Sequence, residues 1–150
     1  MGLINCASWY SQCEGLDYYE AKRVLAYKKV AENVYTGKVK GTEVYDVTID
    51  ILHPRRSSCT CPHAIGRRIV CKHQIALYFK AIPSEAIKFK EDVKRQEEEY
   101  QEYEEQLRLR LEKYLNKLPK ADVIQILMNV VDTSPEWVYD NLIRHTIGWR

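Results

Sequence analysis

The spacing of hydrophobic residues changes along the chain, and each change predicts a different element. Over residues 8–20 apolar side chains recur at helical intervals, whereas residues 21–34 fit a helix and a strand equally well. Residues 43–51 alternate between two faces, with Tyr45, Val47, Ile49 and Ile51 on one and Val44, Asp46, Thr48 and Asp50 on the other, which predicts a strand with one buried face. With residues 34–40 as the partner strand, Gly41-Thr42 predicts a two-residue hairpin turn.

From residue 72 onwards the pattern is helical. Residues 72–82 predict a short helix that Pro83 ends. Residues 84–118 predict one long helix of roughly 50 Å, and two shorter helices follow Pro119. The chain therefore divides into a first domain, residues 1–82, and a helical region, residues 83–150. Along the long helix an apolar face steps by three or four residues through Phe89, Val93, Gln96, Tyr100, Tyr103, Leu107, Leu111, Tyr114 and Leu118.

The middle of the long helix is acidic and would repel nucleic acid. Its glutamates have no base among them: Glu97, Glu98, Glu99, Glu102, Glu104 and Glu105. The apolar face departs from strict heptads, so two arrangements stay open. The helix could form a coiled coil through which two copies of the chain make a homodimer, or it could fold back on the C-terminal helices.

Composition is typical of a globular protein with a core of its own, since 45% of the 150 residues are hydrophobic and 29% are charged. No apolar stretch approaches the roughly eighteen residues that cross a bilayer. The N-terminus lacks the basic start and apolar core of a secretory signal. We therefore expect a cytoplasmic protein with no membrane partner.

The net charge of +2 conceals an asymmetry. Residues 1–84 contain twelve Lys/Arg against seven Asp/Glu, and no acidic residue occurs between Asp50 and Glu85. A surplus of bases in one half of a chain favours a polyanionic partner for that half, although a solvated loop also favours Lys and Arg.

Three of the five cysteines and two of the four histidines lie in one stretch, CTCPHAIGRRIVCKH (residues 59–73). Cys59 and Cys61 are separated by one residue, and Cys71 and His73 repeat that spacing. In extended or turn backbone the two members of such a pair point to the same side, so four side chains can converge on one zinc ion. Three cysteines and one histidine form a closed set of ligands that stabilises structure and leaves no position for a substrate.

Other interpretations of the cluster explain less of it. A thioredoxin-like redox site needs two residues between its cysteines, and a nucleophilic Cys71 with His73 as its base leaves Cys59 and Cys61 unexplained. His63 lies in the same loop and is the rival for the fourth ligand; the pairing with Cys71 favours His73. His53 and His145 are expected to be structural. Cys6 and Cys13 are expected to be buried thiols.

The cysteine motif and its surroundings resemble the SWIM zinc finger. The shared features are Cys-x-Cys followed by Cys-x-His, the preceding strand Gly41 to Ile49, the Cys61-Pro62 pair, and Lys72 to Ala76 at the start of a helix. The resemblance covers residues 15–80. It implies a strand within residues 22–30, and a zinc-binding module for DNA or for protein partners. We therefore expect an α+β fold: a small antiparallel sheet with a zinc finger and a following helix, then the long helix and a C-terminal helical hairpin.

Two non-enzymatic hypotheses lead, because the sequence shows no Walker loop, Ser-His-Asp pattern or acidic metal triad. A third, an enzyme, would require an open position on the zinc. In the first, the finger binds DNA or RNA, with Tyr35 and Tyr45 available to stack on bases. In the second, the finger or the acidic long helix binds another protein as an adaptor. The phosphate contacts expected under the first hypothesis are Arg55, Arg56, Arg67, Arg68 and Lys72.

Overall fold

The computed structural model describes residues 2–146, which divide into two compact units. The first unit runs to Gln96 and the second begins at Glu97, within one continuous helix. The first contains the sheet and the cysteine cluster, and the second consists of helices.

The first unit begins with helices, as the spacing of its apolar residues predicts. A short 3-10 helix, η1 (Ile4–Cys6), leads into α1 (Trp9–Glu20). The Ser8 side chain caps α1 by accepting a hydrogen bond from the Ser11 amide at 3.2 Å. Cys6 is exposed and Cys13 is half-buried, so the prediction that both thiols are buried is wrong.

An antiparallel sheet of four strands in chain order follows α1. Its strands are β1 (Val24–Ala31), β2 (Val34–Lys40), β3 (Val44–Asp50) and the two-residue β4 (Ser58–Cys59). The ambiguity over residues 21–34 is thereby settled in favour of a strand. The β2–β3 register pairs Lys40 with Val44, so three residues form the loop, Gly41 to Glu43, one more than predicted.

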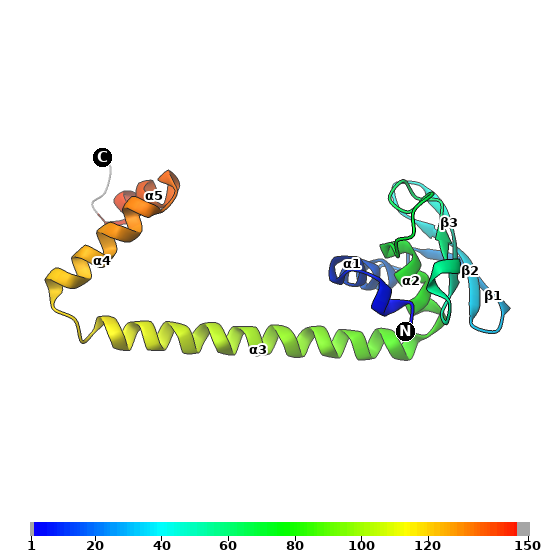
Figure 1. Ribbon diagram of the computed structural model, residues 1–150, viewed down its shortest axis with the longest axis horizontal. Coiled ribbons are helices and arrows are strands. Elements are labelled where there is room, and N and C mark those ends of the chain that lie inside the picture. Colours follow the sequence, from blue (N-terminus) through cyan, green and yellow to red (C-terminus); the bar gives the residue numbers. More distant parts are fainter. Residues whose placement is uncertain (1, 147–150) are drawn as a thin grey trace. The chain divides into compact units, whose positions relative to one another are not determined.

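The core of the first unit lies between the sheet and α2 (Lys72–Ala81). Figure 1 shows α2 between α1 and the sheet, so this helix is enclosed on two sides. Every residue from His73 to Phe79 is accordingly buried. The alternation predicted for β3 is confirmed, because Tyr45, Val47 and Ile49 all face this core.

A turn stabilised by Asp50 carries the chain from β3 towards the cysteines. The Asp50 carboxylate accepts hydrogen bonds from the amides of Leu52 (3.2 Å) and His53 (2.8 Å), and the Asp50 amide donates to the Ser57 hydroxyl at 2.9 Å. Burial opposes ionisation of Asp50, but these amides and the His53 ring together lower its pKa. The short 3-10 helix η2 (Pro54–Arg56) is held in this turn.

The long helix α3 (Pro83–Leu115) belongs to both units. Its first turns pack in the core of the first unit, where Ala86 and Phe89 are buried and the Phe89 ring stacks on Phe79 at 5.6 Å. Beyond Phe89 no residue of α3 is buried.

The second unit continues α3 and adds α4 (Lys120–Thr133) and α5 (Glu136–Thr146). The two shorter helices that the sequence predicts are therefore present. Val131 is the one buried residue of α4, and many apolar side chains of this unit are exposed. None of the helices within residues 2–146 combines the length and apolar composition needed to cross a bilayer.

Candidate metal centre

Four buried side chains come together at the point where the sheet meets α2: Cys59, Cys61, Cys71 and His73. Their ligand atoms all lie within 4.8 Å of one another. These are the four residues that the spacing of the cysteine motif singles out.

Each ligand is held by ordinary backbone structure. Cys59 lies in β4, opposite Val47 of β3. The Cys61 carbonyl accepts hydrogen bonds from the amides of Ala64 and Ile65, both at 3.0 Å, and so starts a tight turn. Cys71 is the N-cap of α2, and its amide donates to the Gln74 side chain at 2.8 Å. The helix then directs the side chain of its second residue, His73, back to the thiols.

The loop between the two ligand pairs turns at a glycine in the left-handed conformation. Gly66 has φ +69°, a conformation that a side chain disfavours. An isolated bridge between Ala7 and Val70 then ties the end of the loop to the segment before α1.

The geometry fits a tetrahedral zinc ion. The Nδ1 atom of His73 is 3.8 Å from the sulfurs of both Cys59 and Cys71. Zinc–sulfur bonds of about 2.3 Å and zinc–nitrogen bonds of about 2.0 Å would separate sulfur and nitrogen by roughly 3.6 Å. The donor set and this spacing are compatible with one structural zinc, with Nδ1 as the histidine ligand.

Cys59 and Cys71 lie close enough to change each other's ionisation. A hydrogen bond from Cys59 lowers the pKa of Cys71 to about 4, against the burial of that thiol and with help from His73. The same hydrogen bond, together with burial, raises the pKa of Cys59. Buried thiolates this close repel one another, and a dication coordinated between them removes that repulsion.

Aromatic rings surround the histidine ligand. The His73 ring lies 4.8 Å from the ring of Tyr45 and 5.3 Å, edge to face, from that of Tyr18. Its second nitrogen, Nε2, is buried without a hydrogen-bond partner. Gly41 covers this side, since a Cβ atom there would lie 2.8 Å from Nε2 and 2.8 Å from Cε2 of Tyr45. Gly41 is therefore needed for close approach to the histidine.

We expect Gly41→Ala to weaken the metal centre, because neither a metal-bound His73 nor a buried Tyr45 has room to move aside. The expected cost is about 1–3 kcal/mol in the free energy of unfolding, with faster release of zinc to a chelator. Thermal unfolding and chelator competition measure the two effects. Gly2→Ala is the matched control, since no heavy atom lies within 4 Å of a Cβ atom there. Unchanged stability and zinc release in Gly41→Ala would contradict this role.

The rival histidine does not join the ligands. His63 is exposed, and it lines a cavity of about 450 Å³ beside Cys61 and Lys72. His53 contacts the Asp50 carboxylate, with its Nδ1 3.4 Å from Oδ1, and His145 is exposed.

The structure separates the predicted nucleic-acid contacts into two kinds. Arg55, Arg56, Arg67 and Arg68 are exposed. Lys72 is half-buried: its Nζ atom lies 2.9 Å from the Glu14 carboxylate and 4.9 Å from the centre of the Tyr18 ring. The bond to Glu14 raises the pKa of Lys72, although burial acts against it. Lys72 thus links α2 to α1, and the Glu14 carboxylate offsets its charge.

The suggestion that Tyr45 stacks on bases is wrong. Its side chain is buried against His73, and its hydroxyl oxygen lies 2.6 Å from the Thr42 hydroxyl. Tyr45 is part of the shell around the metal ligands. Tyr35 is half-buried.

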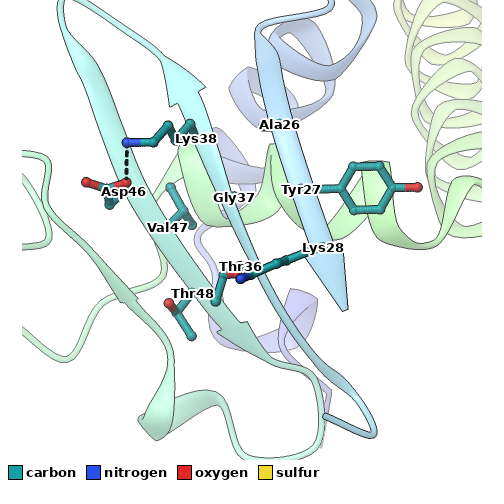
Figure 2. A pocket seen from close by; sticks show the side chains of 9 residues that line it. All are labelled: Ala26, Tyr27, Lys28, Thr36, Gly37, Lys38, Asp46, Val47 and Thr48. Carbon is teal, nitrogen blue, oxygen red and sulfur yellow. Dashed lines mark ion pairs between the residues drawn. The ribbon is translucent and has the colours of Figure 1, made fainter. Parts of the chain in front are cut away.

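The opposite face of the sheet carries polar side chains that the sequence did not mark as a group. Figure 2 shows Lys28, Thr36 and Thr48 gathered there, with Lys38 joined to Asp46 at 3.0 Å. They line a shallow hollow of about 430 Å³. Period-two alternation places these residues on one face, but only the strand register shows that three strands meet there.

Comparison with known proteins agrees with this centre. Residues 45–82 match the family model of the SWIM zinc finger. The matched segment runs from β3 to the end of α2 and contains all four ligand residues. No curated protein and no solved structure matches the chain.

Proposed function

Because residues 45–82 form a SWIM zinc finger, we propose that this protein is a non-catalytic binding module whose finger region contacts DNA or RNA. The observation that carries the proposal is the exposure of four arginines, Arg55, Arg56, Arg67 and Arg68, on the two segments that flank the first ligand pair. Zinc would hold these segments in place. The bound ion would stabilise the fold of the finger and neutralise the charge of the cysteine thiolates.

The electrostatics of this region support a polyanionic ligand. No acidic side chain lies between Asp50 and Glu85, so nothing within the segment neutralises the arginines. Arginine binds phosphate oxygens through a planar fork of donors, and each phosphate contact releases counterions from the nucleic acid. We leave Lys72 out of the contact surface because it is paired with Glu14.

We expect the full chain to bind nucleic acid with a strong dependence on salt, and Arg67→Glu/Arg68→Glu to weaken that binding. If both arginines meet phosphates, the slope of log affinity against log salt should become shallower by about two on duplex DNA. Fluorescence anisotropy over a salt series, on single-stranded and duplex DNA and RNA, measures this slope. Zinc content and thermal unfolding of the variant show that the finger is intact.

Lys28→Glu/Lys40→Glu is the matched control, since it makes the same charge change on exposed positions of the sheet face. It should lower affinity only slightly. Loss of binding in this control but not in the arginine variant would move the contact to the sheet face. No detectable binding at low salt, or no salt slope, would remove the proposal.

The absence of catalysis is part of the proposal. A catalytic zinc keeps a position for water or substrate, whereas three cysteines and one histidine occupy all four tetrahedral positions. A cytoplasmic location is also proposed. It is supported by an odd number of cysteines and by thiols that a reducing compartment keeps free for metal.

A protein-interaction role is the second candidate, and the long helix favours it. Large apolar side chains on α3, such as Tyr100 and Tyr103, are exposed beside the acidic run from Glu97 to Glu105. Nucleic acid would be repelled there, but a protein with a basic and apolar face would not.

A further inference from the structure

We propose that α3 pairs with α3 of a second copy of this chain, in antiparallel orientation, about a two-fold axis at Leu107. The inference concerns the second unit and does not depend on nucleic-acid binding by the finger. It rests on the exposure of an apolar stripe, on the symmetry of that stripe, and on the placement of charges beside it.

The stripe lies on one face of the helix. Its members, Tyr100, Tyr103, Leu107, Leu111 and Tyr114, are between 42% and 61% exposed. They advance in steps of three and four residues and average 3.5, the repeat at which two helices keep a continuous seam. Contiguous exposed apolar side chains of this size mark an interaction surface.

The stripe is symmetric about its centre. Tyr103 and Leu111 lie four residues to either side of Leu107, and Tyr100 and Tyr114 lie seven to either side. Antiparallel pairing at this centre therefore places the Tyr103 position against Leu111 of the other copy. It places Tyr100 against Tyr114 in the same way, and Leu107 of one copy packs on Leu107 of the other. Every layer of the seam is therefore apolar.

Charge along α3 is arranged in two opposite blocks around the same centre. Six glutamates and no base lie between Glu97 and Glu105, whereas three bases, Arg108, Arg110 and Lys113, and one acid, Glu112, lie between Leu107 and Leu115. Antiparallel pairing brings the acidic block of one copy against the basic block of the other. Parallel pairing in register would bring acid against acid and base against base, which is unfavourable.

Individual side chains fit the same register. With about 3.6 residues per turn, Glu99 lies on the flank of the stripe that also carries Lys113. In an antiparallel pair like flanks face each other, so Glu99 meets Lys113 of the other copy. Glu104 and Arg108 share the opposite flank and meet in the same way. Both pairings exist twice, because a two-fold axis repeats each contact.

The occupant that fits this surface is thus a second copy. The helical segment from Glu97 to Leu115 is about 28 Å long, so the seam between the two copies is short. We therefore expect a dimer whose population rises with concentration, detectable by sedimentation velocity.

Cysteine cross-linking tests the register and the orientation. In zinc-loaded full-length protein carrying Cys6→Ser, the variants Tyr103→Cys and Leu111→Cys are purified separately, mixed and exposed to a mild oxidant. Antiparallel pairing predicts a mixed disulfide between positions 103 and 111, identified by mass spectrometry. Glu105→Cys, on the opposite side of the helix, is the control and should cross-link far less.

Charge exchange tests the pairing in solution. Glu99→Lys and Lys113→Glu, singly, should each raise the dimer dissociation constant roughly fivefold or more, and the double variant should recover the original value. These residues are fourteen positions apart in one helix, so recovery requires contact between copies. A chain that stays monomeric throughout, disulfides only between identical positions, or no recovery in the double variant would each overturn the proposal.

Discussion

Cys71→Ala is expected to abolish zinc binding and to unfold residues 55–80. The side chain supplies one of four ligands and also caps α2, the helix that packs between α1 and the sheet. Binding of a structural zinc contributes about 10–16 kcal/mol to the folding of zinc-finger peptides near neutral pH. Losing stabilisation on that scale should release the segment. Zinc-to-protein ratio and hydrogen exchange by mass spectrometry measure the two effects.

Two further variants make this experiment specific. Cys59→Ala should behave like Cys71→Ala, because β4 pairs with β3 through only two residues and is held mainly by its metal ligand. Cys6→Ala should keep both zinc and protection from exchange, since that thiol is exposed and lies outside the cluster. One zinc per chain in either ligand variant would show that the ligand set is wrong.

Phe79→Ala is expected to lower the free energy of unfolding of the first unit by about 3–5 kcal/mol. The Phe79 side chain is fully buried. Its ring contacts Tyr19 of α1 at 6.3 Å and Phe89 of α3 at 5.6 Å, so one side chain joins three helices. Truncation leaves a cavity that these neighbours can fill only in part. Denaturant unfolding of the zinc-loaded protein measures the loss.

The control for Phe79→Ala is an aromatic residue that folding leaves in water. Tyr10 is 70% exposed, and Tyr10→Ala should change stability by less than about 0.5 kcal/mol. An equal loss of unfolding free energy in the two variants would contradict the role of Phe79 in joining the three helices. If Phe79→Ala does not fold even with zinc, Phe79→Leu gives a smaller and measurable loss.

The ligands could be predicted from the sequence because their geometry is mostly local. Cys59 and Cys61, like Cys71 and His73, are held together by the backbone between them, and only the meeting of the two pairs depends on the fold. The β2–β3 hairpin could also be predicted, because the alternation along residues 45–51 puts the apolar side chains on one face of the strand. Periodicity alone did not identify strand β1, because its exposed residues, apolar and basic alike, have no single period; the resemblance to the SWIM zinc finger is what implied it.

Other features depend on segments far apart in the chain. The sequence suggests that Lys72 is an unpaired base, but its Nζ atom lies 2.9 Å from the carboxylate of Glu14, fifty-eight residues earlier. Gly41 reads as a turn residue, but its lack of a side chain makes room for His73. Tyr45 was a candidate for stacking on bases, yet its ring packs on His73. Each of these contacts joins segments that the periodicity of the sequence does not relate to one another.

The burial of the metal ligands also determines how the protein responds to thiol-modifying agents. Cys59, Cys61 and Cys71 are at most 5% exposed, whereas Cys6 faces solvent. A reagent should modify Cys6 at once but reach the ligands only when the finger opens locally. The rate of zinc release at low reagent concentration therefore measures the equilibrium between closed and open forms of the finger. Cys6 in the same molecule provides the reference rate for an unprotected thiol.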